Sequence, residues 1–241
     1  MRERVLFSWS GGKDSALALY ELLRDPRYEV AALLTTISEA YRRISHHGVR
    51  EELVEMQATA LGLPLHKVYL PSSAAGPCRN EQYEELMGRA LAELRIQGLS
   101  AVAHGDIFLE DLRAYRERNL ARIGLRGLFP IWHRDTTTLV RDFVGLGFKA
   151  YLTCVEGRLG AKFAGRSIDE RFLQDLPAGI DPCGENGEYH SFVHEGPIFR
   201  RMVPVKLGVV VEREGRFYAD LLAAGAPAAA PLLPQEIPRI R

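Results

Sequence analysis

The chain has 241 residues, 46% of them hydrophobic, which suits one large α/β domain or two modest ones. Its 31 basic and 31 acidic residues cancel, and this balance argues against nucleic acid as a partner. The three cysteines, Cys78, Cys154 and Cys183, lack metal-ligand spacing, and no apolar run is long enough for a signal sequence or a membrane span. We therefore expect a cytoplasmic protein with reduced thiols and no membrane contact.

Short apolar runs alternate with helical patterns in the first half of the chain. The expected strands are Val5–Phe7, Val30–Leu34, Leu65–Leu70 and Ala101–Ala103. The expected helices are Asp14–Leu23, Val49–Leu61, Asn80–Ile96 and Glu110–Ile123. Such alternation predicts an α/β fold with a doubly wound parallel sheet, in which ligands bind at the carboxyl ends of the strands.

The pattern changes after Gly127. A helix over Leu128–Leu146 and a strand over Phe148–Val155 are expected, followed by a Gly- and Pro-rich stretch and a hairpin with its turn at Glu214-Gly215. These features predict a smaller α+β domain. We expect three parts: an N-terminal domain over residues 1–127, a C-terminal domain over residues 128–222, and an Ala- and Pro-rich tail over residues 223–241.

The clearest motif is Ser10-Gly11-Gly12-Lys13-Asp14-Ser15, between the first expected strand and helix. Glycines allow a sharp turn and a close approach of phosphate, and the amides and dipole of the following helix favour an anion. The two serine hydroxyls and the lysine ammonium add donors. The P-loop pattern fails because Asp14 separates Lys13 from Ser15, and G-x-G-x-x-G is absent.

Two further segments carry candidate site residues. Gly105-Asp106-Ile107 follows the fourth strand, and Arg113 and Glu117 then share one face of the next helix. Near the other end, Glu185 and Glu188 lie in a Gly-rich turn, where a metal, an ammonium or a cationic substrate would relieve their repulsion. A solvated acidic turn is the alternative. We expect residues 184–188 to face residues 10–15 across a cleft between the two domains.

These motifs resemble those of a known family. Ser-Gly-Gly-x-Asp-Ser after the first strand is similar to the PP-loop of N-type ATP pyrophosphatases, which cleave ATP between its α- and β-phosphates. Together with Gly105-Asp106-Ile107, the acidic turn, Pro130-Ile131-Trp132 and Gly196–Phe199, it makes residues 4–200 resemble the diphthine–ammonia ligase family. The resemblance implies a HUP-type domain like the adenine nucleotide alpha hydrolases, followed by a substrate domain.

The resemblance also implies an activity, its cofactors and its partners. The expected enzyme is an ATP-dependent amide-forming ligase that adenylylates a carboxylate, releases pyrophosphate and transfers ammonia or another amine. ATP and Mg²⁺ are the expected cofactors. The family's carboxylate substrate is diphthine on elongation factor 2, and a homo-oligomer is one possible assembly.

The resemblance assigns roles to particular residues. The expected catalytic residues are Lys13, Asp14, Glu185 and Glu188, with Asp14 also positioning the metal. The expected nucleotide-binding residues are Ser10, Gly11, Gly12, Lys13, Asp14, Ser15, Thr35, His47, Gly105, Asp106 and Arg113. The chain departs from the family at His190, where an acidic residue is usual, and in the basic run from Arg42 to His47.

Several alternatives stay open. One is a PP-loop enzyme that modifies a small metabolite or tRNA, and another is a non-catalytic ATP-binding sensor of the universal-stress type. Arg42-Arg43 is either a solvated pair or a cover for the triphosphate or an acidic substrate. We expect His104 to be packed and hydrogen-bonded, Trp132 to be a core anchor between the domains, and Cys183 to be a structural thiol rather than a nucleophile.

Overall fold

A mostly parallel sheet forms the first half of the molecule, which we describe from a computed structural model covering residues 2–44, 47–71 and 78–224. Its strands are β1 (Glu3–Ser8), β2 (Tyr28–Ser38), β3 (Arg43–Ile44), β4 (Leu65–Leu70), β5 (Ala101–Ala103) and β6 (Arg126–Leu128). β1 pairs in parallel with β2 and β5, and these pair in parallel with β4 and β6. The short β3 runs antiparallel to the end of β2.

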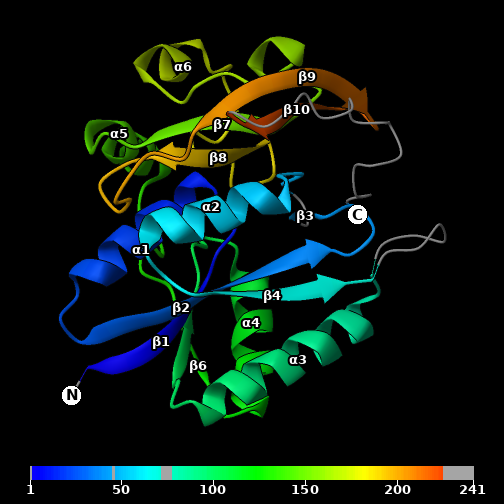
Figure 1. The fold of residues 1–241 in the computed structure, drawn as a ribbon. Coiled ribbons are helices and arrows are strands. Elements are labelled where there is room, and N and C mark those ends of the chain that lie inside the picture. Colours follow the sequence, from blue (N-terminus) through cyan, green and yellow to red (C-terminus); the bar gives the residue numbers. More distant parts are fainter. Residues whose placement is uncertain (1, 45–46, 72–77, 225–241) are drawn as a thin grey trace.

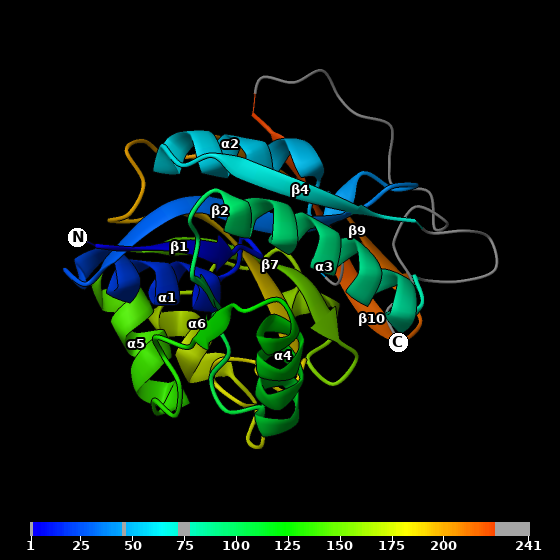
Figure 2. The same cartoon turned by 90° about the horizontal axis from the view of Figure 1, so that it is seen from below.

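Four helices cover the two faces of this sheet: α1 (Lys13–Arg24), α2 (Glu51–Leu61), α3 (Asn80–Ile96) and α4 (Glu110–Arg122). Successive side chains of a strand point to opposite faces. Val5 and Phe7 therefore join the core under α1 and α2, whereas Leu6 joins the core under α3 and α4. Figure 2 views the molecule from the side of α3 and α4. The predicted doubly wound α/β fold is confirmed.

A second, antiparallel sheet follows, in the order β8-β7-β10-β9. Its strands are β7 (Lys149–Glu156), β8 (Tyr189–Glu195), β9 (Val205–Arg213) and β10 (Arg216–Ala223), and its helices are α5 (Thr136–Gly145) and α6 (Glu170–Asp175), with a 3₁₀ turn at Ala161–Phe163. This sheet lies over α1 and α2 (Figure 1). A four-stranded antiparallel sheet with short helices is the smaller α+β unit that the sequence predicts.

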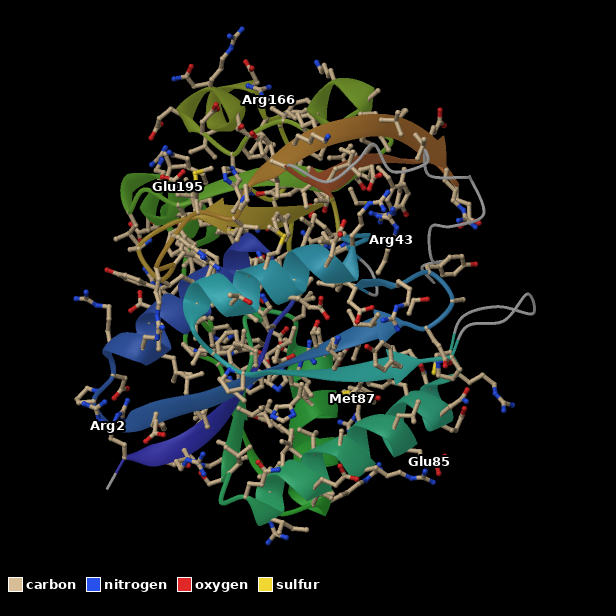
Figure 3. The ribbon with its side chains drawn as sticks, viewed as in Figure 1. Arg2, Arg43, Glu85, Met87, Arg166 and Glu195 are labelled. Atoms are coloured by element: carbon tan, nitrogen blue, oxygen red, sulfur yellow. The ribbon has the colours of Figure 1, made fainter. Side chains whose placement is uncertain are left out.

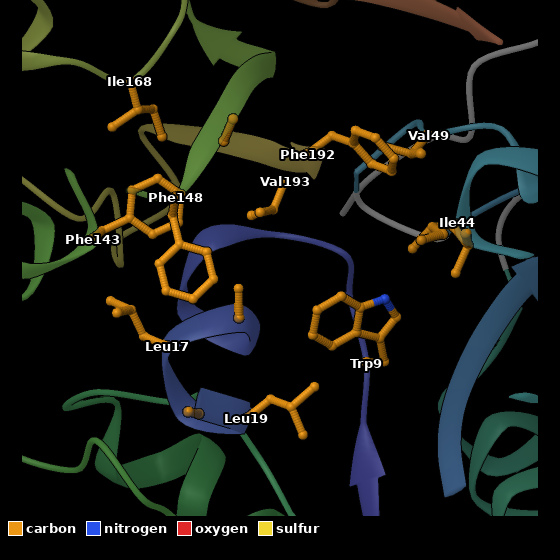
Figure 4. Close-up of a cluster of buried hydrophobic side chains, with 14 of the residues drawn as sticks. Trp9, Leu17, Leu19, Ile44, Val49, Phe143, Phe148, Ile168, Phe192 and Val193 are labelled. Carbon is orange, nitrogen blue, oxygen red and sulfur yellow. The ribbon is translucent and has the colours of Figure 1, made fainter. Parts of the chain in front are cut away.

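One hydrophobic core joins the two sheets. Leu17 of α1 belongs to the same buried cluster as Phe143 and Phe148, whose rings stack 5.0 Å apart, and as Phe192 and Val193 of β8 (Figure 4). Burial of this apolar surface is the main force that holds the second sheet on the first. The phosphate loop lies at the level where the two sheets meet.

Some expected elements differ from the structure. The predicted helix over Leu128–Leu146 is wrong in its first half, because Leu128 ends β6 and α5 begins at Thr136. Between them, His133 adopts a positive φ of 57°, which no helix accommodates. Asp135 then starts α5 by accepting a hydrogen bond from the Thr138 amide at 2.7 Å.

The division into residues 1–127, 128–222 and 223–241 remains a prediction. Most of the predicted tail, residues 225–241, lies outside the described residues, and Ala223 belongs to β10. None of the described helices is long and apolar enough to cross a bilayer.

Candidate active site

The Ser10–Ser15 segment forms a tight loop between β1 and α1. Gly11 has a φ of 80°, and a Cβ there would lie 2.7 Å from the Gln57 side-chain oxygen, so only glycine fits. The Ser10 and Ser15 hydroxyls are 2.8 Å apart, and the Gly12 amide donates to Ser10 Oγ at 3.3 Å. The loop thus places small polar groups at the start of a helix, where an anion is favoured.

Strand β8 of the second sheet binds directly to this loop. The Val193 amide donates to the Gly11 carbonyl at 2.9 Å, and the Lys13 amide donates to Ser191 Oγ at 3.1 Å. The buried Gln57 amide group donates to the carbonyls of both Gly11 (3.0 Å) and Val193 (2.6 Å). The C-terminal sheet therefore holds the loop in shape.

The Lys13 side chain is almost completely buried, at 2% exposure. Its ammonium group lies 2.8 Å from both carboxylate oxygens of Asp14, donates to the Cys183 carbonyl, and is 5.0 Å from the centre of the Tyr189 ring. Burial opposes the charge, but the Asp14 carboxylate and the other partners outweigh it and raise the pKa of Lys13. The positive charge of Lys13 thus lies between the loop and the acidic turn.

Cys183, directly before the acidic turn, accepts a hydrogen bond from Lys13, so the turn lies close to the phosphate loop. The cleft expected between them stays a prediction. Glu185 accepts a hydrogen bond from the Ile107 amide at 2.8 Å, which links the turn to the segment after β5. Burial, and then the nearby charge of Asp14, raise the pKa of Glu185 to about 7. Its carboxyl group can therefore exchange a proton near neutral pH.

Glu188 has a different environment from Glu185. It is only 3% exposed, and its Oε1 accepts hydrogen bonds from the Asp181 amide and the Asn186 side chain, both at 3.2 Å. Its Oε2 is buried with no hydrogen-bond partner among the described residues. Glu188 therefore stabilises the turn through Oε1, and its Oε2 can still accept a hydrogen bond.

The segment after β5 approaches the loop closely. A Cβ on Gly105 would lie 2.9 Å from backbone atoms of Asp14 and Ser15. Asp106 forms a two-point ion pair with Arg116, at 2.7 and 3.2 Å, a partner that the sequence analysis did not identify. Four arginines on α4 follow Asp106, and sequence spacing alone does not say which of them turns toward it.

Arg113 lies over an aromatic pair at the end of β6. Its guanidinium is 4.8 Å from the Phe129 ring centre and 4.7 Å from the Trp132 ring centre. It also pairs with Glu117 at 2.9 Å, which confirms the expected contact between these helix neighbours. Trp132 thus supports Arg113 at the sheet edge.

His104 corrects an expectation. It is packed, at 6% exposure, and stacks on Phe129 with ring centres 5.6 Å apart, but within the described part of the chain neither ring nitrogen has a hydrogen-bond partner. Burial, and then the Arg116 charge, lower its pKa well below the usual value. Thr35 Oγ1 is likewise buried without a partner there. His104 directly follows β5, whereas Thr35 lies within β2, one residue beyond Leu34, the partner of the last β1 residue, Ser8. Such orphaned polar atoms near the ends of β1 and β5 fit a site that a polar ligand or water completes.

His47 and His190 meet beside the loop. Their ring centres are 4.6 Å apart, and His47 Cε1 is 3.3 Å from the position that a Cβ on Gly12 would take. His47 therefore lies where the sequence predicts a nucleotide contact. The sequence analysis did not foresee that His190 would be its neighbour, because they come from different sheets.

The comparison with known proteins follows this geometry. The sequence matches the diphthamide synthase N-terminal domain over residues 1–127 and the diphthamide synthase C-terminal domain over residues 135–221. The chain belongs to the diphthamide synthase family. The resemblance inferred from the motifs is thereby confirmed.

Relatives of this diphthamide synthase family member include proteins named diphthine–ammonia ligase. The one from Danio rerio is 28% identical over 228 residues, which cover 83% of this chain and 85% of the relative. The one from Homo sapiens is 25% identical over 246 residues, covering 90% and 88%. A longer one from Schizosaccharomyces pombe is 27% identical over 227 residues, which make up 37% of its length.

The site of this family member fits Mg²⁺ only together with a nucleotide. The described residues contain no group of three or more His, Cys, Asp or Glu side chains that could hold a metal. Asp14 offers a single carboxylate, 26% exposed and already paired with Lys13. Mg²⁺ typically takes one or two carboxylates and completes its shell with substrate phosphates and water.

Cys183 has the surroundings of a structural thiol. It is 1% exposed, its Sγ donates to the Thr136 carbonyl at 3.2 Å, and burial raises its pKa. A nucleophilic cysteine needs the opposite shift.

Proposed function

We propose that this protein is an ATP-dependent ligase that adenylylates a substrate carboxylate, releases pyrophosphate, and transfers ammonia or another amine. Family membership and the relatives named diphthine–ammonia ligase support the ligase class. One structural observation carries the proposal: the loop suited to phosphate is hydrogen-bonded to the C-terminal sheet next to Glu185, whose pKa is about 7. This arrangement supports a site in which nucleotide binding and proton transfer would lie side by side.

The nucleotide would be held mainly by the loop. Backbone and hydroxyl groups of Ser10, Gly11, Gly12 and Ser15 would contact phosphate, while Thr35, His47, Gly105, Asp106 and Arg113 would surround the rest of the nucleotide. Asp14 would meet the Mg²⁺ that accompanies ATP, whose role is to neutralise charge on the phosphates. Lys13 would act by fixing Asp14 and the acidic turn, since its ammonium is buried between them.

The two glutamates would divide the second half-reaction. Glu185 would hold the ammonium or protonated amine and take a proton from it, because its carboxyl group ionises near neutral pH. The neutral amine would then attack the acyl carbon of the adenylate, forming the C–N bond as the C–O bond to AMP breaks. Glu188 would keep the turn in place through its bonds to Asp181 and Asn186.

The first candidate acceptor is diphthine, from the name of the relatives; the family resemblance implies that elongation factor 2 carries it. One observation favours a second candidate, a small carboxylate metabolite: His190, which stands where the family motif usually carries an acidic residue, lies against His47 beside Gly12. The charge at position 190 of this site therefore differs from that of the family motif.

The test is a turnover assay with ATP, ¹⁵N-ammonium and each acceptor, with the nucleotides separated by chromatography. We expect AMP and pyrophosphate and a ¹⁵N-amide with the true acceptor. Glu185→Gln should still bind ATP but form the amide more slowly by about a hundredfold, the size of one lost general acid–base group. Accumulation of ADP and phosphate would reject the proposal, and ATP binding without turnover on either acceptor would point to a sensor.

A further inference from the structure

A buried cluster of three charged residues joins the β3–α2 connection to the C-terminal sheet. Asp220 of β10, 3% exposed, accepts hydrogen bonds from Arg43 (Nη1–Oδ1, 3.1 Å) and from Arg50 (Nε–Oδ1, 3.1 Å; Nη2–Oδ2, 2.7 Å). Arg43 also donates to the Gly48 carbonyl at 2.6 Å. Figure 3 shows Arg43 between the first sheet and the second. Both oxygens of one carboxylate thus bind the two ends of the same connection.

This connection carries His47. The Ile44 amide donates to the Val49 carbonyl at 2.8 Å, which closes the connection into a narrow loop. A Cβ on Gly48 would lie 3.6 Å from the Tyr218 ring, so Gly48 lies against β10. His47 comes directly before Gly48 and borders Gly12 and His190. The ion pairs therefore fix the segment that brings an imidazole to the phosphate loop.

We propose that Asp220 is a positioning residue of the nucleotide site, and that it acts by holding His47 against Gly12, where the imidazole can donate a hydrogen bond to a phosphate oxygen. The proposal rests on the ATP-binding function proposed above. The geometry supports it because Arg43 and Arg50 lie on either side of His47 in the sequence and both bind Asp220. A guanidinium that pairs with a carboxylate through two nitrogens fixes orientation as well as distance.

A double-mutant cycle tests this coupling. Titration calorimetry would measure the Kd of α,β-methylene-ATP, which resists cleavage at the relevant bond, for the wild type, Asp220→Asn, His47→Ala and the double variant. We expect each single variant to bind about tenfold more weakly, the effect of one hydrogen bond to a charged group. The double variant should bind no more weakly than His47→Ala, because Asp220 acts through His47.

The matched control removes another ion pair of the same sheet. Glu195→Gln breaks the pair between Lys149 and Glu195, 2.9 Å apart, on the opposite side of the molecule in Figure 3. We expect it to leave the Kd unchanged. A loss of affinity equal to that of Asp220→Asn would show a general effect of the sheet and overturn the proposal.

Stability is followed separately, because removing the Asp220 charge leaves two arginines without their carboxylate partner. Arg50→Lys is the milder variant: it keeps the charge, loses the two-nitrogen contact, and lies at the more exposed end of the cluster, at 21%. We expect it to weaken binding in the wild type and not in the His47→Ala protein. Additive losses, or an unchanged Kd in both Asp220→Asn and Arg50→Lys, would overturn the inference, whereas a wild type that binds no nucleotide would reject the proposed function itself.

Discussion

At the scale of single residues, the site is defined by charged side chains that are largely buried from water. Lys13, Asp14 and Glu185 influence one another within the space between the two sheets. Lys13 pairs directly with Asp14, so the carboxylate that remains without a cationic partner in this group is that of Glu185. Burial, and then the nearby charge of Asp14, raise the pKa of Glu185 to about 7, against a smaller opposing effect of Lys13.

The raised pKa of Glu185 predicts a pH dependence of stability. The folded protein retains a proton on Glu185 up to about pH 7, whereas the unfolded chain releases it near pH 4.5. The native state thus binds more protons in this window, so the contribution of Glu185 to stability is present below pH 4.5 and is lost as the pH rises to 7. The loss amounts to at most about 3 kcal/mol.

Glu185→Gln should remove this dependence. The free energy of unfolding is measured in urea at pH 5 and at pH 8. For the wild type, Glu185 should make the protein more stable at pH 5 than at pH 8, and this advantage of pH 5 should be smaller for the variant. Glu93→Gln, on the exposed side of α3, is the control and should behave like the wild type. Identical pH profiles for all three proteins would contradict the environment described for Glu185.

At the scale of elements, the start of α1 and the segment after β5 are in van der Waals contact. This contact depends on Gly105, whose missing side chain leaves room for the backbone of Asp14 and Ser15. Backbone atoms within a loop and a helix cannot move aside as the end of a flexible side chain can. The approach of β5 to the phosphate loop is therefore fixed by one glycine.

Two glycine-to-alanine substitutions separate the loss of this contact from the effect that alanine has by itself on stability. Gly105→Ala would place a Cβ 2.9 Å from backbone atoms, so we expect a loss of about 1–3 kcal/mol in the free energy of unfolding and weaker ATP binding. Gly88→Ala, in α3 with nothing within 4 Å of its Cβ position, should gain about 0.5–1 kcal/mol. Equal effects of the two substitutions, measured by urea unfolding, would show that the close approach is not needed.

The sequence predicted those elements whose pattern is local. β1, the phosphate loop and α1 follow from an apolar run, two glycines and a helical period, and β2, β4, β5 and α2 to α4 follow in the same way. β6 was missed because Arg126-Gly127-Leu128 has no apolar run, and it is held by its pairing with β5 and by the packing of Leu128 on the core.

The missed parts of the site depend on contacts between distant segments. The sequence pattern of β8 is not typical of a strand, because Ser191 and His194 are buried polar residues. The burial of Ser191 is explained only by the Lys13 amide that it binds. The Asp220 cluster joins residues that are far apart in the sequence, so no sequence spacing predicts it. That the His104 nitrogens find no hydrogen-bond partner among the described residues is likewise a property of the assembled fold.

At the scale of the whole molecule, the two sheets share one buried core that runs from α1 and α2 into β7 and β8. Gln57 adds hydrogen bonds across the same boundary. Each sheet therefore loses part of its buried surface when the other is lost.

This shared core predicts cooperative unfolding. We expect a single calorimetric transition whose calorimetric and van't Hoff enthalpies agree. Fluorescence of Trp9 and Trp132 and far-ultraviolet circular dichroism should report the same midpoint. Two separated transitions, or a tryptophan signal that precedes the loss of secondary structure, would contradict a common core.

The pairing of the phosphate loop with β8 has a consequence for biosynthesis. Lys13 and Ser191, which share a hydrogen bond, are 178 positions apart in the chain. On a translating ribosome the loop emerges first, but the strand that gives it its shape emerges only after most of the protein has been made. ATP can stabilise only a state that binds it, so we expect the nucleotide to bind the finished chain and to give no stability to the nascent N-terminal half.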